Sequence, residues 1–175
     1  MRLRITFAAV LLVAAASDAH AQPEATCGLV QADHIWQGTG VDVTLGQKVC
    51  VQARGIWSHG PEAGDMTPFH GPRGYIGKPQ ERPSPIVPWP YARIGTLLGK
   101  IDSEGVAFPI EDELCFVAKA PGELMLSMND SLDAFDDNRG TLRVRITTVR
   151  EWKALAPHWD SPSALSANWP CFNRL

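Results

Sequence analysis

Residues 129–140, NDSLDAFDDNRG, are the part of the chain best suited to bind a cation. Four aspartates and two asparagines lie within its first ten positions, and neither histidine nor cysteine interrupts them. Carboxylate and amide oxygens are hard ligands that suit calcium, which takes about six to eight of them in a flexible geometry. The run lacks the spacing of an EF-hand loop. Composition leaves two interpretations: a calcium site of another kind, or an acidic turn solvated by water.

Short β-strands are expected to hold this segment in place. Apolar and polar residues alternate through VDVTLGQKVCVQA (41–53), on either side of a central glycine. In residues 141–149, Leu142, Val144 and Ile146 face one side and the residues between them face the other. Further strand-like runs span residues 95–101, 105–110, 113–120 and 123–128. Turn residues separate the runs, so the pattern predicts an all-β fold, an antiparallel β-sandwich.

The first 21 residues have the features of a secretory signal peptide. Arg2 and Arg4 precede an apolar run at residues 5–16, and AHA (19–21) matches the small-x-small cleavage pattern. The apolar run is too short to cross a membrane as a helix. The formal net charge is −3 and no cluster of lysine and arginine is present, which argues against nucleic acid as a partner. We expect a secreted or periplasmic protein with no membrane insertion.

Two segments of the remaining chain break the strand pattern. Residues 58–94 are rich in proline and glycine, and a loop of that length in a compact domain is typically functional or disordered. Residues 150–175 carry three tryptophans and are expected to form a tail packed on the domain. The expected organisation is therefore a signal peptide (1–21), a β-sandwich domain (22–149) and a C-terminal tail (150–175).

Cys27, Cys50, Cys115 and Cys171 are predicted to form two disulfides. An even number of cysteines in a secreted chain favours disulfides over metal binding, and no C-x-x-C pair is present. Four cysteines allow three pairings. The simplest joins Cys27 to Cys171, near the two ends of the mature chain, and Cys50 to Cys115, each within a strand-like run.

No motif indicates catalysis. A glycosidase needs two carboxylates that face each other across the substrate, and the spacing of the acidic residues supports no such pair. A nucleophile elbow, an HExxH motif and a phosphate-binding loop are all absent from the sequence. We therefore expect a binding protein rather than an enzyme.

Three segments carry a resemblance to a known family: MNDSLDAFDDNRGTLRVRI (128–146), GQKVCVQARGIWSHGP (46–61) and GTLLGKI (95–101). They resemble the calcium-site segment, the strand and turn ending in Tyr-Gly-Pro, and the Gly-Ala-Leu strand of the bacterial PA-I-type galactose-binding lectins. The resemblance covers roughly residues 30–148. It implies a jelly-roll β-sandwich that binds sugar hydroxyls directly on a calcium ion.

The resemblance also implies a set of calcium ligands. By position, Asp130 is the principal carboxylate ligand, and Asp137 and Asn138 are two adjacent side-chain ligands. Main-chain carbonyls of Ala134 and of His59, which stands where the family has tyrosine, complete the set. Because a carbonyl ligand does not depend on the side chain, these differences leave the set intact. Five protein ligands leave about two coordination positions for sugar hydroxyls.

The expected sugar contacts depart from those of the family. Asp137 replaces an asparagine, while Arg82 and Pro85 occupy the places of the family's sugar-binding His and Gln. Proline's side chain offers no hydrogen bond, whereas Arg82 offers donors that suit the carboxylate of an acidic sugar. Asp130, Asp137 and Arg82 are thus predicted to contact the ligand, a galactose-like sugar or a uronate.

Several aromatic residues have two interpretations. Trp89, in VPWPYA, is either a platform for a sugar ring or a residue that packs the proline-rich loop on the sandwich. His59 and His70 are expected to be turn residues, since each precedes Gly-Pro. Trp36 and Trp57 flank strands and are expected to lie in the core.

The sequence therefore predicts a lectin-like, calcium-dependent carbohydrate-binding protein, with its oligomeric state left open. The alternative is a calcium-stabilised β-sandwich that binds a non-sugar partner and has a degenerate sugar site.

Overall fold

The computed structural model of the chain describes residues 24–60, 69–75, 87–149 and 171. The expected signal peptide, Arg82 and Pro85, and the expected tail up to residue 170 lie outside the described residues. Within the described part, no helix is long and apolar enough to cross a membrane.

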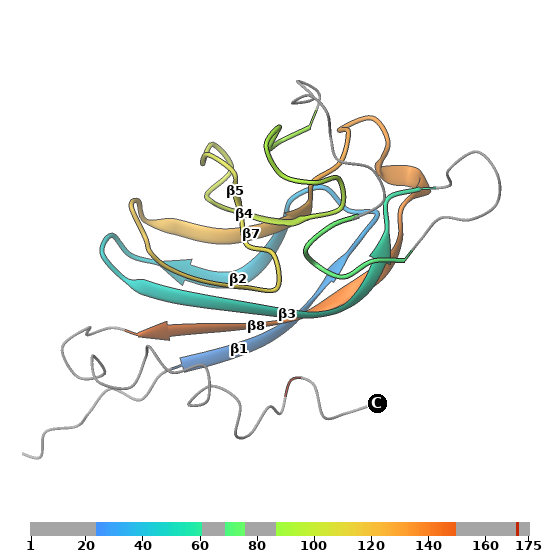
Figure 1. Ribbon diagram of the computed structural model, residues 1–175. Coiled ribbons are helices and arrows are strands. Elements are labelled where there is room, and N and C mark those ends of the chain that lie inside the picture. The colour runs from blue at the N-terminus through green and yellow to red at the C-terminus, as the bar shows by residue number, and fades with distance from the viewer. Residues whose placement is uncertain (1–23, 61–68, 76–86, 150–170, 172–175) are drawn as a thin grey trace, which may run out of the picture.

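Eight strands of the described part form two antiparallel four-stranded sheets that pack face to face (Figure 1). The first sheet has the order β1-β8-β3-β6, and the second has the order β2-β7-β4-β5. The strands are β1 Glu24–Gln31, β2 Gln37–Val43, β3 Lys48–Ser58, β4 Leu97–Ile101, β5 Phe108–Pro109, β6 Glu113–Val117, β7 Gly122–Met128 and β8 Arg139–Val149. A single turn of 3-10 helix, η1 (Phe135–Asp137), lies between β7 and β8.

The pairing pattern is that of a jelly roll. β1 pairs with β8, β2 with β7, β3 with β6, and β4 with β5, all antiparallel. The chain therefore folds as one long hairpin whose two arms wrap together into a sandwich. This confirms the all-β, antiparallel jelly-roll β-sandwich expected from the sequence.

Alternating apolar side chains fill the space between the sheets. On β8, Leu142, Val144 and Ile146 are at most 1% exposed, as the sequence pattern predicted. Leu124 and Leu126 on β7 are fully buried in the same cluster. Burial of one such side chain contributes about 2 kcal/mol, so this layer determines which face of each strand turns inward.

The strands differ most from the sequence pattern at β1, β3 and β5. The pattern misses β1 because Leu29, in the middle of that strand, points outward with 63% of its surface exposed. β3 continues past residue 53 to Ser58, into the segment expected to be a loop. The run at residues 105–110 contributes only the two residues of β5, because a proline has no N–H to continue the ladder.

The two tryptophans expected in the core have different environments. Trp57 is fully buried, and its indole N–H donates to the carbonyl of Gly95 at 2.8 Å. Trp36 is only half-buried, and the Nζ atom of Lys100 lies 4.5 Å from its ring centroid. The expectation was right for Trp57 and wrong for Trp36, which is half-buried and covers the buried side chain of Lys100.

The structure contains both disulfides in the pairing that the sequence indicated. Cys50 and Cys115 are directly opposite each other on β3 and β6, with a Cα–Cα distance of 4.0 Å. Cys27 on β1 is joined to Cys171, with a Cα–Cα distance of 5.5 Å. One bridge thus ties two strands of the first sheet, and the other ties β1 to a residue far beyond β8.

Replacement of both Cys50 and Cys115 by alanine is predicted to lower the free energy of unfolding by about 4 kcal/mol, because the closed loop constrains the unfolded chain. The sequence separation across this bridge is 65. Urea unfolding of the oxidised proteins measures the change. The matched control is the Cys27→Ala/Cys171→Ala variant, whose longer separation of 144 predicts a slightly larger loss. A variant lacking Cys50 and Cys115 that unfolds at the same urea concentration as the parent would contradict the prediction.

Candidate functional site

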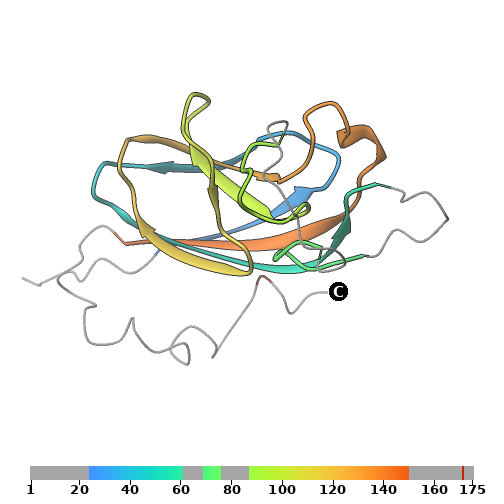
Figure 2. The same cartoon turned by 45° about the horizontal axis from the view of Figure 1, so that its top comes forward.

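Two strand pairings bring distant parts of the chain to one end of the sandwich. Ser58 pairs with Arg139 at the end of the β3–β8 ladder, and Leu97 pairs with Met128 at the end of the β4–β7 ladder. The acidic loop between β7 and β8 therefore lies beside the residues that follow β3, as the orange loop and the end of the teal strand show (Figures 1 and 2). Phe135, in η1, is 4% exposed and anchors this loop in the core.

Asp130 is the most buried carboxylate of the loop. It is 6% exposed, and its Oδ1 accepts a hydrogen bond from the main-chain N–H of Ser131 at 2.7 Å. Its Oδ2 is buried without a hydrogen-bond partner among the described residues. Burial raises the pKa of Asp130, and the charge of Asp137 raises it further, while Ser131, Asn138 and His59 oppose the shift.

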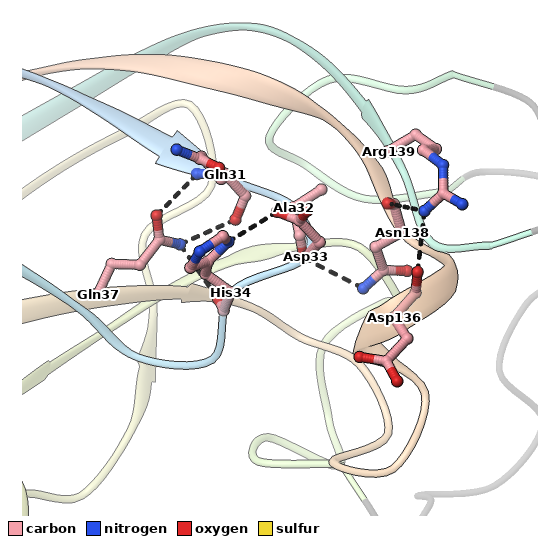
Figure 3. A network of polar contacts seen from close by, with 8 residues as sticks. All are labelled: Gln31, Ala32, Asp33, His34, Gln37, Asp136, Asn138 and Arg139. Atoms are coloured by element: carbon pink, nitrogen blue, oxygen red, sulfur yellow. Dashed lines mark hydrogen bonds and ion pairs between the residues drawn. The ribbon is translucent and has the colours of Figure 1, made fainter.

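Asn138 is fully buried beside the turn that joins β1 and β2. Its Nδ2 donates to the carbonyl of Ala32 at 3.2 Å, a bond that orients the amide (Figure 3). Gln31 and Gln37 hold this turn through two hydrogen bonds of 2.8 Å, one in each direction. The Oδ1 of Asn138 is a second buried oxygen without a partner among the described residues.

Asp137 lies against the residues that follow β3. Gly60 has a positive φ of 97°, and a Cβ atom there would overlap the carboxylate of Asp137. The glycine therefore allows the close approach of the two chain segments. Asp137 is exposed, and it sits next to His59, whose charge acts on Asp130.

His59 and His70 form a hydrogen-bonded pair behind this site. Nδ1 of His59 lies 3.0 Å from Nε2 of His70, and Nδ1 of His70 lies 3.1 Å from the carbonyl of Gly71. A carbonyl only accepts, so Nδ1 of His70 carries the proton and its Nε2 accepts from His59. Burial lowers the pKa of His70, which keeps it neutral. His70 also pairs with Trp57 in an isolated β-bridge, so it is a buried positioning residue rather than the turn residue that the sequence suggested.

Asn129 ties the end of β7 to the loop that precedes β4. Its Nδ2 donates to the carbonyls of Trp89, Ala92 and Arg93 at 3.0, 3.3 and 3.1 Å, and its Oδ1 accepts from the N–H of Trp89 at 3.1 Å. The side chain is fully buried. Sequence reasoning missed this role, because the partners lie some 40 positions away along the chain.

Trp89 is half-buried and lines an apolar cleft of about 540 Å³. Val106, Phe108 and Phe116 contribute to the same cleft, and the ring of Tyr91 lies 6.4 Å from that of Trp89. The main chain of Trp89 is fixed by Asn129, next to Asp130. Both interpretations of Trp89, as packing residue and as ligand contact, are compatible with this position.

The structure brings four of the five predicted ligands together. Asp130, Asp137, Asn138 and His59 interact around one carboxyl group. Ala134 lies in the same loop, where its N–H donates to Ser131 at 3.0 Å. The described residues contain no cluster of three His, Cys, Asp or Glu side chains suited to a metal. A metal here would therefore depend on two carboxylates, an amide oxygen and main-chain carbonyls, a donor set that suits calcium better than transition metals. The ligand roles stay a prediction.

The fold and the loop-end cluster define a jelly-roll β-sandwich domain with a polar, partly buried loop site. Among solved structures, the chain is similar to one described as "EclA N-terminal domain; PllA-like lectin". The TM-score is 0.54, with 23% sequence identity, over 71% of this chain and 96% of that chain. No family model and no curated protein matches the chain. The likeness supports the fold of a lectin domain, and the narrower resemblance to PA-I-type galactose lectins stays a prediction.

Asp130→Asn is predicted to stabilise the protein in EDTA at pH 7, by about 1 kcal/mol, because it removes a buried negative charge whose Oδ2 has no hydrogen-bond partner among the described residues. The pKa of Asp130 in the folded protein is raised above the usual 3.8. The ionised carboxylate therefore lowers the free energy of unfolding at any pH above this folded pKa. The loss disappears as the pH falls below the pKa of the unfolded chain, where Asp130 is protonated in both states. Urea unfolding at pH 7 and near pH 3.5 measures both effects. Asp133→Asn, at an exposed carboxylate of the same loop, is the control and should change little. Lower stability of Asp130→Asn in EDTA at pH 7 would contradict the prediction.

Asn129→Ala is predicted to lower the free energy of unfolding by about 3 kcal/mol, because it removes four buried hydrogen bonds. The N–H of Trp89 and the carbonyl of Ala92 lose the partner they have in Asn129, while the carbonyls of Trp89 and Arg93 keep a main-chain donor. Ser127→Ala is the matched control on the same strand. Ser127 is equally buried, but its Oγ has no hydrogen-bond partner among the described residues. Loss of the Ser127 hydroxyl should change the free energy of unfolding by less than about 0.5 kcal/mol. Equal effects of the two substitutions in urea unfolding would exclude the stabilising role of Asn129.

Proposed function

We propose that the protein binds carbohydrate through a calcium ion at the acidic loop. The observation that carries this proposal is the pair of buried oxygens, Asp130 Oδ2 and Asn138 Oδ1, without hydrogen-bond partners among the described residues. Buried polar atoms are nearly always paired, and the side chains of Asp130 and Asn138 interact with each other, so these two oxygens favour a bound cation. The lectin fold of the similar solved structure supports the same function.

The chain's own residues divide the work at this site. Asp130, Asp137 and Asn138 provide side-chain oxygens for the ion, and His59 and Ala134 provide carbonyls. When bound, calcium supplies positive charge and open coordination positions for hydroxyl oxygens. Asp130 and Asp137 also accept hydrogen bonds from those hydroxyls. The bond from Asn138 to Ala32 holds the amide so that its oxygen stays available to the ion.

The ligand we propose is a galactose-like sugar or a uronate. Asp137 has a carboxylate where the PA-I-type lectins that this chain resembles have an amide. The site therefore lacks one N–H donor to the sugar. Arg82, outside the described residues, would pair with the carboxylate of a uronate. Nothing in this arrangement calls for a reaction, so the proposed role is binding rather than catalysis.

A secreted or periplasmic location fits the proposal. Two disulfides are present, and such bonds persist mainly in oxidising compartments. Secretion itself rests on the signal-like residues 1–21.

One observation favours a second function, a calcium-stabilised domain that binds a non-sugar partner. The apolar cleft at Trp89 has a volume of about 540 Å³ and is lined almost entirely by carbon-rich side chains. Such a cleft suits an apolar ligand group better than a sugar. Sugar binding tested with and without EDTA distinguishes the two functions.

Calcium is predicted to raise the melting temperature of the parent at pH 7, because only the folded state assembles the ligands. Calcium-loaded protein should bind galactose or galacturonate with a dissociation constant of about 1 mM, equivalent to about 4 kcal/mol. EDTA and Asp130→Ala should abolish both the thermal shift and the sugar binding. Calorimetry and thermal unfolding measure these outcomes.

Asp133→Asn is the control for this experiment, since it removes an exposed carboxylate of the same loop. It should keep both responses. Arg82→Ala should weaken galacturonate binding and spare galactose if the sugar is a uronate. Sugar binding that survives EDTA would disprove the calcium mechanism, and no thermal shift with calcium would disprove the metal site.

A further inference from the structure

A second cleft, lined by the segment Phe69–Tyr75 and one side of β3, lies next to the proposed calcium site. It has a volume of about 660 Å³, within the range of small-ligand sites. Main-chain hydrogen bonds of 3.0 and 2.9 Å join His70 to Trp57 on β3, and Leu97 donates to the carbonyl of Pro72 at 2.8 Å. Because both sides of the segment are bonded to strands, the wall of this 69–75 cleft is preformed.

The walls of the 69–75 cleft combine aromatic rings with a fixed polar pair. Phe69 is 56% exposed, and Tyr75 is half-buried. Arg73 donates through Nε and Nη2 to the two carboxylate oxygens of Asp112, at 2.9 and 2.8 Å. This pairing lowers the pKa of Asp112, so the carboxylate stays ionised at neutral pH.

Such a combination suits a sugar ring. The C–H face of a pyranose packs against an aromatic side chain, and its hydroxyls need donors and acceptors at set positions. The bidentate pair uses only part of the hydrogen-bonding capacity of Arg73 and Asp112, so N–H donors and lone pairs remain for hydroxyls. The charges at the cleft balance: Arg54 also lines it and acts on Asp112, and Glu111 acts on Arg73. Two arginines thus face two carboxylates, which favours a neutral sugar over an acidic one.

One layer of rings connects the 69–75 cleft with the residues beside the acidic loop. His70 and Tyr75 line the cleft, and the ring of His59 lies 5.2 and 5.4 Å from theirs. The residue after His59 is Gly60, which contacts the carboxylate of Asp137. Three contacts in sequence therefore connect the cleft to the acidic loop: the rings of His70 and Tyr75, the ring of His59, and Gly60 against Asp137.

We propose that the 69–75 cleft is a second saccharide subsite, which binds the neutral sugar residue linked to the one held at the acidic loop. The preferred ligand of the protein is then an oligosaccharide rather than a monosaccharide. This inference rests on the proposed function, because the first sugar must lie at the acidic loop.

Gly71 offers a direct way to block the subsite. It lines the cleft, and a Cβ atom placed on it would meet nothing within 4 Å. Gly71→Phe should therefore fill the cleft without disturbing its walls. Phe69→Ala and Arg73→Ala remove one apolar and one polar contact. Leu45→Ala, at a 71% exposed position in the turn between β2 and β3, is the control at the other end of the sandwich.

The experiment is calorimetry on calcium-loaded protein with galactose and with the disaccharides melibiose, lactose and digalacturonate. The parent should bind melibiose or lactose about tenfold more tightly than galactose, because the second sugar residue adds contacts in the cleft. A tenfold gain in affinity equals about 1.4 kcal/mol of binding free energy. Gly71→Phe, Phe69→Ala and Arg73→Ala should reduce this advantage to less than about twofold and leave galactose affinity unchanged. Leu45→Ala should keep the full advantage. The amide NMR signals of Gly71 and Gly74 should shift with the disaccharide and not with galactose.

The outcomes separate the subsite from the proposed function. Suppose that galactose binding requires calcium, but no disaccharide binds more tightly or the gain survives Gly71→Phe. This result overturns the subsite and leaves the proposed function in place. Preference for digalacturonate over both neutral disaccharides overturns the neutral assignment. No calcium-dependent binding of any of these sugars overturns both. The calcium-induced rise in melting temperature, measured for each variant, shows that its fold and acidic loop are intact.

Discussion

The buried side chain of Asn129 sets the position of the loop end on which the candidate site depends. Its four hydrogen bonds join residues 89–93 to the end of β7, and its main chain pairs with Gly95 and Thr96. The carbonyl of Gly95 in turn accepts the indole N–H of Trp57. In the low dielectric of the interior, each of these bonds is stronger than in water, and each would be costly to break. Asp130, the next residue, therefore has a fixed main chain and cannot turn its carboxylate to solvent.

This constraint holds two buried oxygens of the loop, Asp130 Oδ2 and Asn138 Oδ1, that have no hydrogen-bond partner among the described residues. Buried oxygens without a partner lower the free energy of unfolding. The ladder of β3 and β8, which pairs eleven residues of each strand, and the apolar layer beneath it offset that loss. A rigid scaffold that holds an unfavourable local arrangement is typical of binding sites, because the ligand then finds its contacts already in place.

How much the sequence revealed depends on the range of the interactions involved. Alternation along β8 is a local pattern, so the sandwich was predictable. The oxygen-rich composition of the acidic loop is local too and marked a candidate cation site, while the ligand roles came from the family resemblance and stay a prediction. Three sets of hydrogen bonds join residues from separate parts of the chain: those of the Asn129 side chain, the His59–His70 pair and the Arg73–Asp112 pair. No local pattern reports such contacts. β1 escaped prediction for a related reason: its place at a sheet edge leaves Leu29 exposed and hides the alternation.

The histidine pair links the two proposed subsites in one rigid unit. The neutral His70 donates through Nδ1 to Gly71, in the wall of the 69–75 cleft, and accepts through Nε2 from His59. Gly95 has a positive φ and packs against the ring of His70, where no side chain would fit. The ring is thereby held from three sides: by Gly71, by His59 and by the loop that Asn129 fixes. One imidazole thus connects His59, which follows β3, with the aromatic wall of the cleft. Because His70 also bridges to Trp57 on β3, a single strand positions both the wall of the cleft and the residues that lie against Asp137.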